Sequence, residues 1–284
     1  MRIGIDVGGT TVKGLALAPD GAVLAEHRAP TPAPDPDGRR VVAVVAEVAR
    51  ALGHRPGAPV GVALPGVVDE TTATAVLSAN LGWADVAVGH LLGDLLGPGA
   101  LVCHDVRAGA VAEARTGAAA GAAGVVAFVP VGTGVSAAVL VDGVPLRAGG
   151  FAGEIGQLVL ADGPFRGLRT EQVASASATA RRAGLPGAVD VARAVHEGDP
   201  AAQRVWAETV DVLGQSLAGL VAVVAPAVLV VGGGLALAGD LLLDPLRARL
   251  AALLPGLRVP RLVPAAHGDT AAARGAALLA GDAS

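Results

Sequence analysis

Residues 2–18 read RIGIDVGGTTVKGLALA, which is a short apolar run, a glycine pair and a second apolar run. This pattern predicts strands over residues 2–7 and 11–18 joined by a tight turn, because glycine permits the positive φ that tight turns need. Asp20-Gly21 is a further turn signal, and residues 22–28 have the composition of a third strand. The chain is therefore expected to open with a β-meander and not with a strand–helix–strand unit.

Length and composition exclude several classes of protein. The 284 residues suggest about two domains, and the 52% hydrophobic and 16% charged content excludes a disordered chain. A net charge of −4 without a basic stripe argues against nucleic acid as a partner. The single cysteine, Cys103, excludes an internal disulfide and a cysteine-cluster metal site. Asp6 lies where a secretory leader would need an apolar stretch, so we expect a cytoplasmic protein.

One uncharged stretch is long enough to cross a membrane. No charged residue lies between Asp211 and Asp240. Pro226 and the glycines at 232–234 interrupt the stretch, which favours a helix, then a buried strand over residues 227–231, then a glycine turn. We therefore predict no membrane span.

The opening pattern returns in the second half of the chain. Residues 125–131 form an apolar run that enters Gly132-Thr133-Gly134, and a predicted hairpin follows over residues 136–147. Further strands are expected at 60–64, 100–104 and 258–263, and helices at 39–52, 84–97, 107–120, 171–183, 188–197, 199–224, 238–253 and 269–279. The repetition predicts a duplicated α/β architecture of two lobes with a cleft between them. We place the small N-terminal lobe in residues 1–106 plus 270–284 and the large C-terminal lobe in residues 107–269.

Three glycine-rich turns each follow an apolar strand, and they are the first candidate functional features. They are Asp6-Val7-Gly8-Gly9-Thr10, Gly132-Thr133-Gly134 and Gly232-Gly233-Gly234. Such a turn lets backbone N–H groups approach a phosphate, although a single glycine pair is more often a plain bend. An aspartate beside the turn, Asp6, can order a water-coordinated Mg²⁺. No match to the P-loop pattern is present.

Three acids are candidate catalytic or binding groups. Asp105 ends the apolar strand 101–103 and precedes a helix, at the strand end where α/β proteins bind ligands. A plain helix N-cap is the alternative for this residue. Glu154 lies among small residues and can accept hydrogen bonds from hydroxyl groups, or can be a solvated loop acid. Glu171 begins a predicted helix, where the helix dipole alone would favour an acid.

These residues together resemble the ROK family of sugar kinases and regulators, and most closely its bacterial glucokinase-like members. The resemblance covers essentially the whole chain. Besides the three glycine turns and Asp105, it rests on four motifs in the family's order: ALPGVVD at 63–69, NLGW at 80–83, GEIG at 153–156 and TEQ at 170–172.

The resemblance implies a fold, a reaction and a set of site residues. The fold is the actin-like, ribonuclease H-like ATPase fold, with ATP between two lobes. Asp105 would be the general base that takes a proton from a sugar hydroxyl, usually the 6-hydroxyl, and Asp6 would hold Mg²⁺ through water. The phosphates would face Gly8, Gly9, Thr10, Thr11, Gly132, Thr133 and Gly134; the adenosine would lie near Gly232, Gly233 and Gly234; the sugar would contact Pro65, Gly66, Asn80, His104, Glu154, Gln157 and Glu171. The resemblance also implies a homodimer.

The chain departs from the family pattern at its zinc site. The family usually has GEIGH followed by CxCGxxGCxE, whose histidine and three cysteines hold a structural zinc. Here Gln157 occupies the histidine position, and the three cysteine positions carry Asp162, Pro164 and Arg169. No thiolate remains, so we expect no structural zinc. The loop is then expected to be held by packing.

The chain also departs from the family pattern around the base. The family has ENDxN where this chain has Cys103-His104-Asp105-Val106-Arg107. His104 occupies the position of an asparagine that binds sugar in the family. It either replaces that asparagine as a neutral hydrogen-bonding group or changes which sugar the pocket prefers. The exchange of one hydrogen bond, worth ~0.5–3 kcal/mol, can change substrate preference about tenfold. Glucose and an amino sugar such as kanosamine are both candidate substrates. Arg107 either reaches a phosphate or forms a salt bridge.

Three other classes of protein share parts of this pattern. A ROK transcriptional regulator needs a helix-turn-helix module before the phosphate strand, which here begins at Ile3. Another actin-like ATPase would not explain GEIG together with Glu171. A catalytically degenerate ROK-fold sensor or scaffold stays open as the alternative, because the zinc site is lost and the base context is altered. Lys13, the only lysine, is expected on the solvent face of its strand.

Overall fold

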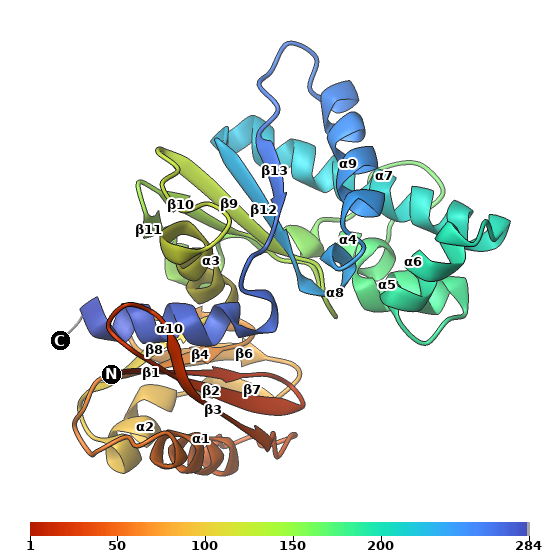
Figure 1. The fold of residues 1–284 in the computed structure, drawn as a ribbon. Coiled ribbons are helices and arrows are strands. Elements are labelled where there is room, and N and C mark those ends of the chain that lie inside the picture. Colours follow the sequence, from red (N-terminus) through yellow and green to blue (C-terminus); the bar gives the residue numbers. More distant parts are fainter. Residues whose placement is uncertain (283–284) are drawn as a thin grey trace. The chain divides into compact units, whose positions relative to one another are not determined.

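The structure is a computed structural model that describes residues 1–282 (Figure 1). The chain divides into two compact units: one comprises residues 1–117, 144–152 and those from 269 onward, and the other residues 118–143 and 153–268. The first unit therefore continues beyond the predicted boundary at residue 106. The reason is that helix α3 (Asp105–Thr116) packs along helix α10 (Ala271–Asp282), with Ala108 and Ala276 in one buried cluster.

A five-stranded sheet forms the centre of the first unit, in the order β3-β2-β1-β4-β8. The strands are β1 (Arg2–Val7), β2 (Thr11–Leu17), β3 (Val23–Pro30), β4 (Val60–Leu64) and β8 (Ala100–His104). Strand β2 is antiparallel to β1 and β3, while β1, β4 and β8 run parallel, so the predicted meander is confirmed. Alternate residues of the strands enter opposite layers: Ile5 and Val62 pack on one face, and Ala63 and Cys103 pack on the other.

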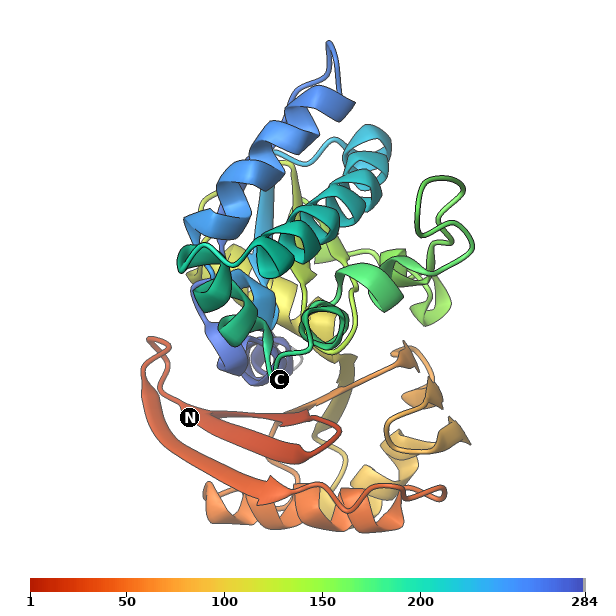
Figure 2. The same ribbon diagram turned by 90° about the vertical axis from the view of Figure 1, so that its right-hand side faces the viewer.

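Helices cover both faces of this sheet. Helices α1 (Arg39–Ala51) and α2 (Val88–Leu96) pack on one face, and Figure 2 shows α1 lying along the meander strands with the C-terminal helix on their other side. Helix α10 approaches its neighbours unusually closely. A Cβ added at Gly275 would lie 1.7 Å from the Ala108 carbonyl oxygen, and one at Gly61 would lie 2.0 Å from the Ala276 carbonyl oxygen. Only glycine fits these two positions.

A second, three-stranded antiparallel sheet in the first unit was not predicted. It consists of β5 (Val67–Asp69), β6 (Thr74–Ser78) and β7 (Trp83–Val86). The prediction of a helix from residue 84 was wrong at its start, since β7 occupies residues 83–86 and α2 begins at Val88. Trp83 decides the local structure: it is buried, and its Nε1–H donates to the Asp35 carbonyl oxygen (2.8 Å).

The sheet of the second unit repeats the strand order of the first. Its order is β11-β10-β9-β12-β13, with an antiparallel meander edge followed by parallel strands. Strands β9, β10, β12 and β13 belong to the second unit, and the short β11 belongs to the segment 144–152 that is grouped with the first. The strands are β9 (Val125–Pro130), β10 (Ala138–Val141), β11 (Val144–Pro145), β12 (Val228–Gly232) and β13 (Arg261–Pro264). The predicted duplication is therefore confirmed.

Helices of the second unit bury one face of that sheet. They are η2 (Ile155–Gln157), α4 (Thr170–Ala174), α5 (Ala176–Ala183), α6 (Ala188–His196), α7 (Pro200–Val224), α8 (Gly233–Ala236) and α9 (Asp240–Leu253). η1 (Ala148–Gly150) belongs to the first unit, and the chain passes from the second unit to the first within η3 (Gly268–Thr270). Helix α7 is long and apolar enough to span a membrane, but half of its most apolar stretch is buried in the unit. Its residues Trp206, Leu213 and Leu217 belong to the core, as expected for a helix that leads into a buried strand.

Candidate active site

The first glycine turn joins β1 to β2 and places Asp6 near its start. The Gly8 N–H donates to the Thr11 carbonyl oxygen (3.0 Å), and the Thr31 hydroxyl donates to the Gly8 carbonyl oxygen (2.7 Å). Asn80 lies against the turn, because a Cβ at Gly9 would be 3.3 Å from the Asn80 Cβ. The structure thus brings a predicted sugar ligand to a predicted phosphate turn. The phosphate role of Gly8, Gly9, Thr10 and Thr11 stays a prediction.

Lys13 is part of this site, contrary to its predicted position on the solvent face. It lies opposite Asp6 in the β1–β2 register and is only 8% exposed. Its Nζ forms an ion pair with Asp269 Oδ2 (2.8 Å) and also donates to the Asp269 backbone carbonyl. The sequence signal for Lys13 was its spacing from Asp6 across a tight turn. Asp269 could not be found this way, since it lies 256 residues away.

Asp105 is the first residue of α3, directly after β8. Its side chain is 30% exposed, and its Oδ1 accepts a hydrogen bond from the Val106 N–H (2.7 Å). Burial raises the pKa of Asp105 to about 6, although the backbone hydrogen bond and Arg107 oppose the shift. Burial raises the pKa of Asp6 to about 7, and the negative charge of Asp105 adds to that shift. The two carboxylates therefore share one electrostatic environment.

The shifted pKa of Asp105 leads to a prediction for the pH dependence of turnover. A general base acts only as a carboxylate, so kcat is expected to fall ~10-fold per pH unit below about pH 6. Between pH 3.8 and about 6 the folded state binds more protons at Asp105 than the unfolded chain, so the free energy of unfolding should decrease as the pH rises through this window. A kcat profile that stays flat down to about pH 4 would contradict the assignment.

His104, and not Asp105, caps helix α3. The Arg107 N–H donates to His104 Nδ1 (3.4 Å), and His104 Nε2 lies 3.3 Å from Asp105 Oδ1. His104 is 3% exposed, and burial together with Arg107 lowers its pKa to about 3, so the ring is neutral. The ring also hydrogen bonds to the backbone of Gly66, which follows Pro65 between β4 and β5. Gly66 has φ +95°, and a Cβ there would lie 2.1 Å from the Leu77 carbonyl oxygen.

The second and third glycine turns lie together in the second unit. Strands β9 and β12 pair in parallel, with Gly232 opposite Pro130. A Cβ at Gly233 would lie 2.5 Å from the Val131 carbonyl oxygen, so the third turn packs directly on the strand that enters the second. The Gly132 carbonyl oxygen accepts a hydrogen bond from the Ala176 N–H (2.8 Å), which ties the Gly132-Thr133-Gly134 turn to the start of α5.

A cavity of about 370 Å³ lies beside the third glycine turn. Helix α5 contributes Ala176, Ala180 and Arg181, the loop before α6 contributes Leu185 and Pro186, and Gly234 closes one side. A small, largely apolar cavity next to a glycine turn could take a nucleoside base, and the adenosine role of Gly232, Gly233 and Gly234 stays a prediction. Arg181 was not singled out from the sequence, since nothing in its local pattern distinguishes it from Arg182.

The predicted sugar acid Glu171 lies over the second glycine turn. Its Oε2 would be 3.0 Å from a Cβ at Gly134 and 3.2 Å from one at Gly156, so both glycines allow the carboxylate to approach. Its Oε1 accepts a hydrogen bond from Gln157 Nε2 (2.9 Å). Glu154 precedes η2, and its carbonyl oxygen accepts from the Gln157 N–H (3.1 Å). The structure thus joins Glu171, Gln157 and the second turn in one site.

The residues at the family's zinc positions do not fit that metal. Asp162, Pro164 and Arg169 supply no thiolate, and the Arg169 guanidinium donates to Gln157 Oε1 (2.8 Å). Within residues 1–282, no group of three or more His, Cys, Asp or Glu side chains could hold a metal ion.

The loop over residues 158–170 is held by hydrogen bonds as well as by the predicted packing. Backbone bonds close it as a hairpin: Thr170 N–H donates to Leu158 O (2.8 Å), and Leu160 N–H donates to Leu168 O (2.8 Å). Leu160 belongs to the core of the second unit, and the Arg182 guanidinium lies 4.6 Å over the Phe165 ring. The Arg169–Gln157 contact therefore adds a hydrogen-bonded support that sequence reasoning did not foresee.

Comparisons with known proteins agree with this geometry. Residues 2–283 match the sequence profile of the ROK family. The chain is 30% identical to a glucokinase from Streptomyces coelicolor, over 87% of this chain and 86% of that protein. It is 31% identical to a kanosamine kinase from Amycolatopsis mediterranei, over 99% and 96% of the two chains. A Streptomyces griseus ROK glucokinase, solved with glucose and AMPPNP, superposes with a TM-score of 0.85 at 26% identity and 99% coverage of both chains. The fold is thus the actin-like, ribonuclease H-like fold, and the chain belongs to the ROK family.

Proposed function

We propose that this ROK-family chain, an ATP-dependent sugar kinase, phosphorylates a hexose or hexose derivative at the 6-hydroxyl, with Asp105 as general base. The observation that supports this most directly is the position of Asp105. It is a partly exposed carboxylate at the junction of β8 and α3, with a raised pKa and a shared electrostatic environment with the first glycine turn. A base with such a pKa is largely ionised at neutral pH and is still basic enough to accept a proton.

The reaction needs little covalent chemistry from the protein. Asp105 accepts the hydroxyl proton while the sugar oxygen attacks the γ-phosphorus and ADP leaves. In the first unit, the backbone at Gly8, Gly9, Thr10 and Thr11 faces the phosphates, and Pro65, Gly66, Asn80 and His104 contribute to the sugar pocket. The second unit supplies Gly132, Thr133 and Gly134 for the phosphates, Gly232, Gly233 and Gly234 for the adenosine, and Glu154, Gln157 and Glu171 for sugar hydroxyls.

The residues around Asp6 fit a magnesium ion. Asp6 and Asp105 bring two carboxylates into one environment, and the raised pKa of Asp6 comes first from burial and then from the excess negative charge that Asp105 adds there. A bound cation would relieve that excess, and Mg²⁺ keeps most of its water ligands in such sites. When bound, Mg²⁺ neutralises charge on the phosphates. Asp6 would hold it through water, and Lys13 would contribute a second positive charge on the same strand pair.

The identity of the sugar depends on two substituted positions, His104 and Gln157. Both are polar and neutral, and both make hydrogen bonds within the protein, so the ring hydroxyls meet a pocket that differs from the family pattern. Glucose and an amino sugar such as kanosamine are the two candidates, in line with what two of the relatives act on by name. We further propose a cytoplasmic homodimer as the working form.

ADP release over a panel of sugars tests the proposed function. The panel contains glucose, mannose, N-acetylglucosamine and kanosamine, each with ATP as donor and with Mg²⁺. We expect ATP-dependent phosphorylation of at least one hexose at its 6-hydroxyl, identified from the product by NMR. Sugar binding without ADP release from any member of the panel would favour the alternative, a degenerate ROK-fold sensor or scaffold.

A further inference from the structure

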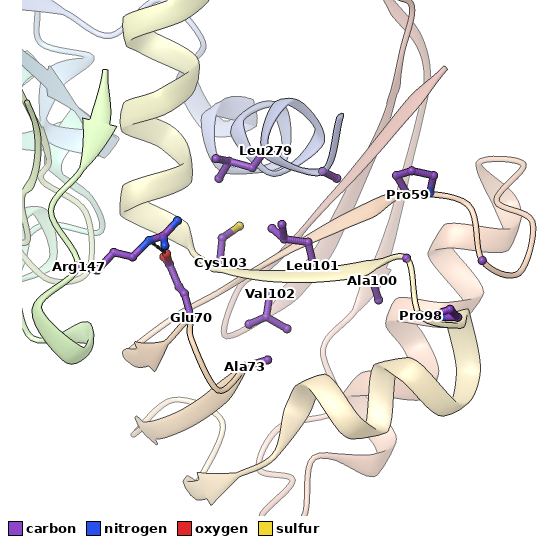
Figure 3. A pocket seen from close by; sticks show the side chains of 13 residues that line it. Pro59, Glu70, Ala73, Pro98, Ala100, Leu101, Val102, Cys103, Arg147 and Leu279 are labelled. Atoms are coloured by element: carbon purple, nitrogen blue, oxygen red, sulfur yellow. Dashed lines mark ion pairs between the residues drawn. The ribbon is translucent and has the colours of Figure 1, made fainter. Parts of the chain in front are cut away.

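A buried ion network lies beneath the junction that carries the base. Glu70, just after β5, pairs through Oε1 with Arg107 Nε (2.7 Å) and through Oε2 with Arg147 Nε (2.7 Å). The Glu70 and Arg107 side chains are 7% and 1% exposed, whereas Arg147 is 55% exposed. Figure 3 shows Glu70 and Arg147 meeting at one end of a cavity of about 690 Å³ along the edge of β8. The salt bridge expected as one alternative for Arg107 is thus present.

The network joins three segments of the first unit that are distant in sequence. Glu70 Oε1 also accepts the His104 N–H (2.9 Å), so one carboxylate oxygen holds both the last residue of β8 and the first turn of α3. The Arg107 guanidinium donates onward to the Val68 carbonyl oxygen (2.9 Å) and to the Gly150 carbonyl oxygen in η1 (3.4 Å). Glu70 therefore holds the chain on both sides of Asp105, at His104 and at Arg107.

These connections fix the orientation of the His104 ring. Since His104 Nδ1 accepts from the Arg107 N–H, the proton of the neutral ring is on Nε2, which donates to the Gly66 backbone and also lies 3.3 Å from Asp105 Oδ1. The Val106 N–H donates to the same oxygen. The Val106 N–H and the His104 ring therefore both lie at the Oδ1 side of the Asp105 carboxylate.

We propose that Glu70 and Arg107 are positioning residues for the base: they hold His104 and the first turn of α3 in place, and thereby fix the orientation in which Asp105 meets the sugar hydroxyl. This inference rests on the proposed function of Asp105.

The decisive variant is Glu70→Leu/Arg107→Met, which removes both charges at once. Removing Glu70 alone would leave Arg107 buried and unpaired, whereas apolar residues of similar size in place of a buried pair preserve folding. We expect the double variant to keep its Tm and its sugar and nucleotide KM close to wild type, and to lose kcat by roughly 10- to 100-fold, as misplacement of a catalytic group does. Glu70→Gln keeps an oxygen that accepts from the His104 N–H and from Arg107 Nε, so it should recover most of that loss in kcat, with a lower Tm because the buried Arg107 charge is no longer paired.

Arg115→Met is the matched control, since Arg115 is on the same helix and forms an ion pair with Asp282 (2.6 Å) away from the base. Its kcat should equal that of wild type. A folded double variant with wild-type kcat, or a loss confined to KM, would overturn the proposal.

A second measurement needs neither activity nor a variant. The ¹⁵N NMR spectrum of the His104 imidazole in the wild-type protein should show a neutral ring with the proton on Nε2, and the His104 amide should exchange slowly. A ring protonated on Nδ1, or a rapidly exchanging amide, would overturn the proposal. If the sugar panel shows no turnover while the NMR result holds, then the proposed function has failed and the hydrogen-bonded arrangement of the network stands.

Discussion

Asp105→Asn is expected to lower kcat by ~10²–10⁴-fold, the range that a positioned general base contributes. Asparagine keeps the size of the side chain and can still accept the Val106 N–H at its amide oxygen, which in the wild type donates to Asp105 Oδ1 (2.7 Å). It cannot accept the proton of an attacking hydroxyl. Sugar and nucleotide binding should therefore persist, which isothermal titration calorimetry would measure alongside steady-state kcat.

The matched control for this substitution is Asp94→Asn. Asp94 is an exposed acid on α2, in the same unit, and its ion-pair partner is His90 on the same helix (3.9 Å). Its replacement should leave kcat at the wild-type value. If Asp105→Asn turned over at a rate near wild type, the base would have to be another group. If the Asp105→Asn variant lost sugar binding together with kcat, the main role of Asp105 would be to bind the sugar and not to accept a proton.

Gly275→Ala is expected to destabilise the first unit by more than about 4 kcal/mol, which places it among the most severe single substitutions. The added Cβ would lie 1.7 Å from the Ala108 carbonyl oxygen, and neither helix backbone can move away cheaply. Helix α10 would have to separate from α3, which carries the base. Urea unfolding followed by Trp83 fluorescence, in a Trp206→Phe background, would report on this unit alone, since Trp83 and Trp206 are buried in different units.

Gly93→Ala is the matched control, because Gly93 is also inside a helix of the first unit but has no atom within 4 Å of its added Cβ. This substitution should raise the free energy of unfolding by ~0.5–1 kcal/mol, since alanine is the better helix former. If the two substitutions changed the free energy of unfolding in opposite directions, close packing, and not helix propensity, would be the reason for glycine at position 275. Equal small effects would contradict the packing seen between α3 and α10.

Much of the fold could be read from local patterns. The meander over residues 2–28, the buried strand near 227–231 and the repeated arrangement from residue 125 all follow from short apolar runs that end in glycine. The second sheet of the first unit was missed because its strands are short and β7 runs almost directly into α2. The role of Trp83 in fixing β7 is recognisable only through its hydrogen-bond partner Asp35, which lies 48 residues away in the sequence.

Several of the predicted site residues also lie together in the structure. The structure brings Asn80 to the first turn, joins Glu171 and Gln157 over the second, and packs the third turn against the strand that enters the second. Lys13 was predicted to face solvent because strand alternation does not show whether the face of the sheet that carries a residue is covered by other parts of the chain. The support for the sugar loop was incomplete because the Arg169–Gln157 hydrogen bond joins two ends of a hairpin whose pairing the sequence does not specify.

The amino-acid sequence by itself determined the duplicated strand order, the three glycine turns and membership of the ROK family, since each depends on residue types at short, fixed spacing. Only the tertiary structure decided which charges meet. Lys13 pairs with Asp269, and Glu70 holds Arg107 and Arg147, across separations that no local pattern encodes. The physical reason is that an ion pair depends on distance in space and on burial, and both are set by how the sheets and helices pack.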